Sequence, residues 1–177
     1  IKTSVPVVIG EKRPETEKVF TDQAGLKGAP LVFAGEKWLA DDWRYEHHQL
    51  CVEMVHVPDN SKEAYLLDLP GIYQTRNLVT VLETLHQLRK SGWILPPAKV
   101  KKALSEVKKL TGLHGRWEII HRHPAVIQDV GHNEDGMKAI VSQLELTDFR
   151  DLHIVIGMAK DKEIGKVLQL LPRSATY

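Results

Sequence analysis

The sequence is poor in several features that mark specialised proteins. It has a single cysteine, Cys51, which excludes an internal disulfide and suits a reducing compartment. No apolar run approaches the roughly 20 residues that cross a bilayer, and a net charge of +1 gives no global field for nucleic acid or a membrane surface. With 42% hydrophobic and 27% charged residues, the 177-residue chain has an ordinary globular composition. We therefore expect a cytoplasmic protein that binds neither nucleic acid nor membrane.

Motifs for several kinds of catalysis are also missing. The chain has no HExxH or CxxC pair, so we expect no metal site from its clustered histidines. No nucleophile elbow supports a Ser-His-Asp triad, and no Walker pattern supports a phosphate loop within these residues. Cys51 lies in an apolar, strand-like run, and we interpret it as core packing. A functional site must therefore depend on local groups of polar side chains.

Two rhythms divide the sequence. Up to residue 112, short apolar or β-branched runs predict strands, and longer segments with a period near 3.6 residues predict helices. After Gly112 the rhythm becomes strand–helix–strand–helix, which is typical of a parallel sheet with right-handed crossovers. We expect an α/β protein with a boundary near residues 111–113. The predicted strands are 5–9, 31–34, 50–57, 64–69, 117–121, 125–130 and 152–156, and the predicted helices are 14–24, 75–89, 97–110, 133–146 and 161–171.

The most informative stretch is Asp129-Val-Gly-His-Asn-Glu-Asp-Gly136, where the predicted strand 125–130 ends. Ligands bind at the carboxyl ends of strands in open α/β sheets, and a carboxylate, an imidazole and an amide gather here. Asn133 has a simpler alternative, because Asn is a preferred N-cap of a helix. An Asp that ends a buried strand is costly when unpaired. We therefore expect Asp129 to bind a ribose hydroxyl or a paired base.

Three other groups are candidates for ligand binding. Arg116 opens a predicted strand, and its planar donors suit a phosphate; an exposed ion pair is the alternative. Gln74 and Asn77 stand three residues apart at a predicted helix start, so they can share a face and bind an adenine edge. Ordinary turn and capping chemistry is the alternative for this pair. The Gly157–Lys162 loop lacks the Walker glycines, so we interpret Asp161 as an N-cap and its lysines as solvated.

Four motifs in this order carry a family resemblance: Leu69-Pro-Gly-x-Tyr-Gln-x-x-Asn77, Thr111-Gly-Leu-His-Gly-Arg-Trp117, Asp129-Val-Gly-His-Asn133 and Gly157-Met-x-x-Asp-Lys162. Over nearly the whole chain they resemble folylpolyglutamate synthase/dihydrofolate synthase, a branch of the Mur ligases. The resemblance implies that residues 1–112 are the end of a central Mur-type ATPase domain, a β-rich segment plus two helices. It implies that residues 113–177 begin a Rossmann-like parallel-sheet C-terminal domain, which is truncated here.

The resemblance also implies an activity. Such enzymes use ATP and Mg²⁺ to convert the carboxylate of a folate or dihydropteroate into an acyl phosphate, which the amine of L-glutamate then attacks. Positioned cations carry most of the stabilisation in phosphoryl transfer. The implied site residues are Gln74 and Asn77 at the adenine, Arg116 at the phosphates, Asp129 at the ribose with Asn133 alongside, and His132 as the catalytic residue at the reacting centre.

The chain departs from the family pattern in two ways. Asn133 is followed by Glu134 rather than Pro, so we expect a differently built helix start. The Walker lysine and the Mg²⁺ carboxylates are not among these residues, and Ile1 is not an initiator Met. We therefore expect a piece of a longer, monomeric protein, inactive and weak in ATP binding by itself.

Three other functions remain open from the sequence. One is a Mur-type peptidoglycan amino-acid ligase, another is a non-catalytic nucleotide-binding module, and the third is an α/β interaction domain in which Arg116 and Asp129 form an ion pair. Within the leading interpretation, the choice between a folate and a dihydropteroate substrate is also open.

Overall fold

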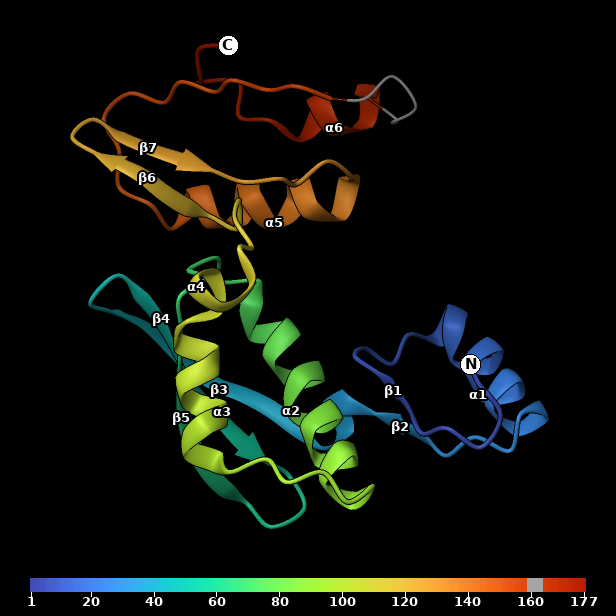
Figure 1. Cartoon of the computed structure of the whole chain (residues 1–177). Helices are drawn as coiled ribbons and strands as arrows, with labels where there is room; N and C mark the ends of the chain where they lie inside the picture. Colours follow the sequence, from blue (N-terminus) through green and yellow to red (C-terminus); the bar gives the residue numbers. More distant parts are fainter. Residues whose placement is uncertain (159–163) are drawn as a thin grey trace. The chain divides into compact units, whose positions relative to one another are not determined.

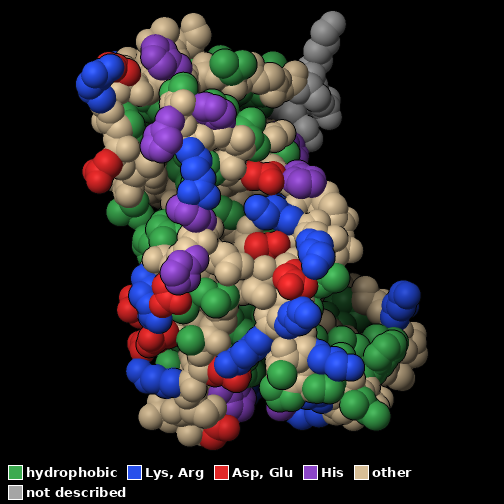
Figure 2. Space-filling view, turned by 60° about the vertical axis from the view of Figure 1, so that its left-hand side comes forward, with side chains coloured by type: hydrophobic (Ala, Val, Ile, Leu, Met, Phe, Trp, Pro, Cys, Tyr) green, Lys and Arg blue, Asp and Glu red, His purple; other side chains and the backbone are tan. Residues whose placement is uncertain are grey.

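The structure is a computed structural model that describes residues 1–158 and 164–177. It consists of two compact units, Ile1–Leu113 and His114–Tyr177. Both units combine helices with strands, so the α/β class is confirmed (Figure 1). Among the described residues, no helix has the length and apolar character to cross a membrane. On the face drawn in Figure 2, acidic and basic side chains lie interspersed, in keeping with the net charge of +1.

The first unit opens with a strand, a helix and a second strand, followed by a short 3-10 turn. Their bounds are β1 (Val7–Ile9), α1 (Pro14–Leu26), β2 (Leu31–Phe33) and η1 (Ala34–Glu36). The helix connects β1 to β2, so the two strands run parallel, with Val8 opposite Val32. The helix α1 has no continuous apolar stripe: its apolar Val19 is 58% exposed, and Ala24 is its buried residue.

A three-stranded antiparallel sheet with helices packed on it forms the core of the first unit. The order is β3-β4-β5, and α2 packs on β3 while α3 packs on β5. The bounds are β3 (Trp38–Glu46), β4 (Gln49–His56), β5 (Ser61–Leu67), α2 (Gln74–Lys90), α3 (Pro97–Ser105) and α4 (Val107–Thr111). Leu50, Val52 and Met54 of β4 are fully buried against these helices. Cys51 is 2% exposed, which confirms it as a core residue.

Two helix predictions in the first unit need correction. The helix expected over 75–89 begins one residue earlier, at Gln74, with Tyr73 as its N-cap. The Thr75 hydroxyl donates to the carbonyl of Ile72 at 2.8 Å. The single helix expected over 97–110 breaks at Glu106, where φ is −131°, and becomes α3 and α4. Asp68 Oδ2 accepts the N–H of Lys108 at 2.8 Å, so a carboxylate from the end of the sheet supports the restarted helix.

The second unit is a strand hairpin packed with two helices. Its elements are β6 (Glu118–Arg122), β7 (Ala125–Gln128), α5 (Glu134–Glu145) and α6 (Ile164–Leu170). Because only residues 123 and 124 connect β6 to β7, these strands pair antiparallel. Met137 of α5 is buried with Val167 and Leu171.

The parallel sheet expected in this unit is found only in part. Residues 152–156 were predicted to be a strand, but within the described residues they make one parallel bridge, His153 with Thr176. The Ile154 N–H donates to the Thr176 carbonyl at 2.8 Å, and the Thr176 N–H donates to the Leu152 carbonyl at 2.9 Å. A strand needs a paired neighbour as well as an apolar pattern, and the pattern alone was visible in the sequence. The Asp161 N-cap prediction lies outside the described residues.

Candidate functional site

Arg116 lies between two residues with left-handed backbones. The φ angle is +69° at Gly115 and +54° at Trp117. Glycine adopts this region freely, whereas a tryptophan held there is strained by about 1–3 kcal/mol. A Cβ on Gly115 would lie 2.5 Å from Cγ1 of Val130, so this position has no room for a side chain. The Val130 N–H also donates to the Gly115 carbonyl at 3.0 Å, which ties the turn to the end of β7.

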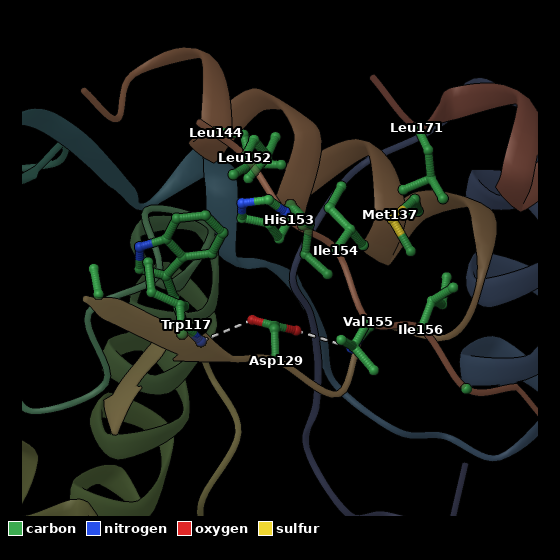
Figure 3. A pocket seen from close by; sticks show the side chains of 15 residues that line it. Trp117, Asp129, Met137, Leu144, Leu152, His153, Ile154, Val155, Ile156 and Leu171 are labelled. Carbon is green, nitrogen blue, oxygen red and sulfur yellow. Dashed lines mark hydrogen bonds between the residues drawn. The ribbon is translucent and has the colours of Figure 1, made fainter. Parts of the chain in front are cut away.

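The carboxylate of Asp129 bonds to the backbone on both sides of this turn (Figure 3). Its Oδ2 accepts the Trp117 N–H at 2.7 Å, and its Oδ1 accepts the Gly131 N–H at 2.8 Å. Asp129 was expected to need an external partner, but these two amides already donate hydrogen bonds to its carboxylate. Each carboxylate oxygen can accept a further hydrogen bond, so contact with a ribose hydroxyl stays compatible with this geometry.

The turn after Asp129 leads directly into α5. Asn133 is the N-cap, and its Oδ1 accepts the Gly136 N–H at 2.7 Å, so the capping alternative is confirmed. Glu134 and Asp135 occupy the first helical turn, where acidic residues favour the helix dipole. His132 is exposed, and its Nδ1 lies 3.1 Å from the carbonyl oxygen of Val130. The Nε2 of His132 is therefore the ring nitrogen available to a ligand.

The guanidinium of Arg116 is half-buried and makes few contacts. Its Nη1 donates to the carbonyl of Gly115 at 3.1 Å. Across residues 1–158 and 164–177 it makes no ion pair, so the surface ion pair considered for Arg116 does not form there. A guanidinium has five N–H donors in a planar fork, and most of those of Arg116 are left to meet an anion.

Glu118 is a polar residue of this turn that sequence reasoning missed. Its Oε2 accepts the Gly115 N–H at 2.9 Å, and its Oε1 lies 3.0 Å from Nδ1 of His114. The Glu118 side chain is 13% exposed and that of His114 is 64% exposed. The available signal was the spacing Gly-x-x-Glu, which lets a carboxylate reach back to the amide three residues before it.

A cavity of about 240 Å³ opens beside Asp129 in the second unit. Apolar side chains form most of its wall, among them Trp117, Met137 and Ile154, and the Asp129 and His153 side chains are its polar groups (Figure 3). Pockets for small molecules usually measure about 300–1,000 Å³. This cavity is smaller than that, so we assign no ligand to it.

Gln74 and Asn77 lie in the first unit, at the start of α2. Asn77 Nδ2 donates to Oε1 of Gln74 at 2.8 Å, so the two amides share one helix face as predicted. Gln74 is 7% exposed, and both side chains line a cavity of about 160 Å³ whose remaining wall is Leu and Val. Within the described residues, Gln74 Nε2 and Asn77 Oδ1 have no hydrogen-bond partner. One donor beside one acceptor can pair with the edge of an adenine ring. At about 160 Å³ the cavity itself is too small to enclose the ring.

The backbone before α2 is closely packed at Gly71, where the Tyr73 ring lies against it. A Cβ there would lie 2.6 Å from Cε1 of the Tyr73 ring. Among the described residues, no three His, Cys, Asp or Glu side chains come together as a metal site. Lys160 and Lys162, which were expected to be solvated, lie outside the described residues.

Comparison with known proteins links both units to one kind of enzyme. Residues 115–177 match the family described as Mur ligase, glutamate ligase domain. The chain is 24% identical over 178 residues to a folylpolyglutamate synthase of Lacticaseibacillus casei, covering 97% of this chain and 39% of that protein. It is 27% identical over 175 residues to a dihydrofolate synthase/folylpolyglutamate synthase of Escherichia coli K12, covering 96% of this chain and 36% of the relative.

The fold is also found in solved structures of such enzymes. The chain superimposes on a structure titled as an FPGS-AMPPCP-folate complex with a TM-score of 0.84 and 19% identity, covering 99% of this chain and 42% of that one. The family resemblance that the four motifs carried is thereby confirmed. The chain spans less than half the length of the relatives it matches.

Proposed function

We propose that this chain is part of an ATP-dependent ligase. Its residues 115–177 match the Mur ligase, glutamate ligase domain, and nearly its whole length is similar to folylpolyglutamate synthases and dihydrofolate synthases. The whole enzyme adds L-glutamate to the carboxylate of a folate or dihydropteroate. The observation that carries this proposal is Arg116, whose half-buried guanidinium makes no ion pair within residues 1–158 and 164–177. Such a group, held in a fixed turn, suits the phosphates of ATP.

In the proposed reaction, the γ-phosphoryl group of ATP is transferred to the substrate carboxylate, giving an acyl phosphate and ADP. The glutamate amine then attacks the acyl carbon, which forms the amide and releases phosphate. Arg116 stabilises charge on the phosphoryl oxygens. His132, with Nε2 available, lies at the reacting centre and holds or moves a proton there. Mg²⁺ supplies further charge neutralisation when bound, and we place its ligands outside this chain.

Each unit contributes to nucleotide binding in its own way. We assign residues 1–112 to the end of the central ATPase domain, where Gln74 Nε2 and Asn77 Oδ1 bind the adenine edge. We assign residues 113–177 to the start of the C-terminal domain, where Asp129 accepts a ribose hydroxyl and Asn133 holds the helix start beside it. Asp129 already orders two backbone amides, so its ribose contact adds to a carboxylate that is fixed in place.

Several properties of the whole protein follow from this proposal. The 177 residues contain no Walker pattern, so we propose that they are inactive and bind ATP weakly by themselves. We propose a monomer in the cytoplasm, where a buried free cysteine such as Cys51 stays reduced. Its partners are the small molecules ATP, L-glutamate and a folate or dihydropteroate.

The first test is phosphate release by the full-length protein with MgATP, L-glutamate and either tetrahydrofolate or dihydropteroate. We expect release that needs both glutamate and a pterin. Arg116→Ala should lower kcat/KM by about 100-fold or more, the usual effect of losing one electrostatic contact to a transition state. Arg150→Ala is the matched control, since Arg150 is an exposed arginine of the same unit that pairs with Asp151 at 2.7 Å.

The pattern of release separates the alternatives. Release with only one of the two pterins identifies the substrate. Release with neither contradicts the folate proposal and directs the search to muropeptide substrates. ATP binding without turnover on any carboxylate substrate would support the non-catalytic module.

A further inference from the structure

Each of the two backbone amides that flank Arg116 donates to a carboxylate. The Gly115 N–H donates to Oε2 of Glu118 at 2.9 Å, and the Trp117 N–H donates to Oδ2 of Asp129 at 2.7 Å. We propose that these carboxylates form a clamp on the Arg116 backbone, and that Glu118 is a positioning residue for the phosphate-binding guanidinium. This inference rests on the proposed function of Arg116.

The backbone of the turn explains why a clamp is needed. Gly115 and Trp117 both have positive φ angles, a conformation that a tryptophan rarely adopts without support. Donation to an ionised carboxylate is stronger than donation to a neutral acceptor. Glu118 and Asp129 therefore select this conformation on both sides of Arg116. Without Glu118, the peptide that carries the Gly115 N–H can rotate, because glycine has access to many backbone conformations.

The burial of Glu118 distinguishes a clamp from a surface ion pair. Its side chain is 13% exposed, whereas its partner His114 is 64% exposed. The Glu118 carboxylate is thus packed within the turn, while the His114 imidazole remains in solvent. Because Glu118 acts as an acceptor for an N–H, a neutral acceptor of the same shape should preserve most of its effect. Glu118→Gln supplies that acceptor and Glu118→Ala removes it.

Asp129 has a second role in the proposed site, so Glu118 is the better residue for testing the clamp. Asp129 orders Gly131 as well as Trp117, and its loss would disturb the turn that carries His132. The bonds from Glu118 reach His114 and Gly115, the two residues directly before Arg116. A change at Glu118 should therefore affect ATP chiefly through Arg116.

The experiment is a double-mutant cycle in the full-length protein. Glu118→Ala should raise the KM for ATP by about tenfold, and Glu118→Gln should stay within about threefold of the parent. In the Arg116→Ala background, Glu118→Ala should change the KM for ATP by less than about twofold, since residues that act through one another are not additive. Glu145→Ala, an exposed carboxylate at the end of α5, is the control and should change nothing.

A second measurement reads the clamp without turnover. Hydrogen exchange at the Gly115 amide should be at least about tenfold faster in Glu118→Ala than in Glu118→Gln, because only the glutamine keeps an acceptor for that N–H. A full tenfold loss on adding Glu118→Ala to Arg116→Ala would overturn the positioning role. Unchanged Gly115 exchange would overturn the clamp itself. If Arg116→Ala alone leaves the KM and kcat unchanged, the proposed function fails while the exchange result still decides the clamp.

Discussion

At the scale of single residues, three polar side chains of the second unit accept hydrogen bonds from backbone amides. Glu118 accepts the amide of Gly115, Asp129 accepts two amides, and Asn133 accepts that of Gly136. These bonds hold the turns at residues 115–117, 129–131 and 133–136 in place. A polar residue near a strand end can therefore serve to hold a loop, and this role has to be considered before a ligand is assigned to it. The guanidinium of Arg116 differs, because its donors are mostly left unused.

A different residue pair makes stability depend on pH. The Tyr65 hydroxyl donates to Glu63 at 2.5 Å; burial and this bond raise the pKa of Tyr65. The same hydroxyl, followed by Lys101, holds the pKa of Glu63 below its usual value despite partial burial. A carboxyl with a lowered folded-state pKa stabilises the protein above its unfolded pKa of about 4.3, and this stabilisation disappears as the pH falls through the folded value.

Replacing Tyr65 tests this linkage. Tyr65→Phe returns the pKa of Glu63 toward its usual value, so stability should fall less steeply between about pH 5 and pH 3 than in the parent. The measurement is the urea midpoint at about pH 7, 5 and 3. Tyr45→Phe is the control, because its hydroxyl donates at 2.8 Å to the carbonyl of Pro70, which does not titrate. An unchanged acid slope in Tyr65→Phe would contradict the assignment.

At the scale of elements, the packing of the turn before β6 against the end of β7 depends on Gly115. Gly115→Ala places a Cβ on a residue whose φ is +69°, and this Cβ contacts the stiff, β-branched Val130. We expect the free energy of unfolding to drop by about 2–4 kcal/mol, from backbone strain plus overpacking. Urea unfolding of the variants measures this loss.

Two other glycines separate the causes. Gly112 has φ +68°, and a methyl group added there would meet nothing within 4 Å. Gly112→Ala therefore reports backbone strain alone and should lose only about 1 kcal/mol. Gly165, inside α6, also has open space, and Gly165→Ala should be neutral or slightly stabilising. Equal losses at Gly115 and Gly112 would show that the Val130 contact carries no weight.

The elements that the sequence predicted well are those whose signal is local. The helices α2 and α5 have an apolar stripe, and β4 is an apolar run, so their positions followed from residue order. The strand β3 was missed because Asp41, Asp42, Arg44 and Glu46 make it polar, and its place at the edge of the sheet comes from pairing with β4. The break at Glu106 was missed because the restarted helix is supported by Asp68, which lies 40 positions before Lys108.

The candidate site divides in the same way. The residue types at Gln74, Asn77, Arg116 and Asp129 were visible in the sequence, and so was the capping alternative for Asn133. The shared face of Gln74 and Asn77 followed from helical spacing and is confirmed at 2.8 Å. The Gly-x-x-Glu spacing was a local signal for the bond from the Gly115 amide to Glu118, but it was missed. The bond from the Trp117 amide to Asp129 was not predictable, because it joins residues 12 positions apart and depends on a left-handed backbone at Trp117. The roles of these residues toward a nucleotide stay predictions.

At the scale of the whole molecule, the two units Ile1–Leu113 and His114–Tyr177 should separate on proteolysis. The five-residue helix α4 and the exposed residues that follow it join them, and Lys109 there is exposed. Brief trypsin treatment should therefore cut within this chain first after Lys109, as mass spectrometry of the fragments will record. Lys109→Gln should slow that cut. A first cut inside the β3–β5 sheet would contradict the division.

Trp117, in its left-handed backbone position, gives the second unit a fluorescent label of its own. Of the four tryptophans in the chain, only Trp117 falls after residue 113, and it is 6% exposed beside the Asp129 carboxylate. Its indole lines the cavity shown in Figure 3. With the other three tryptophans changed to phenylalanine, emission from this one ring would report on the Arg116 turn in real time, without any attached dye.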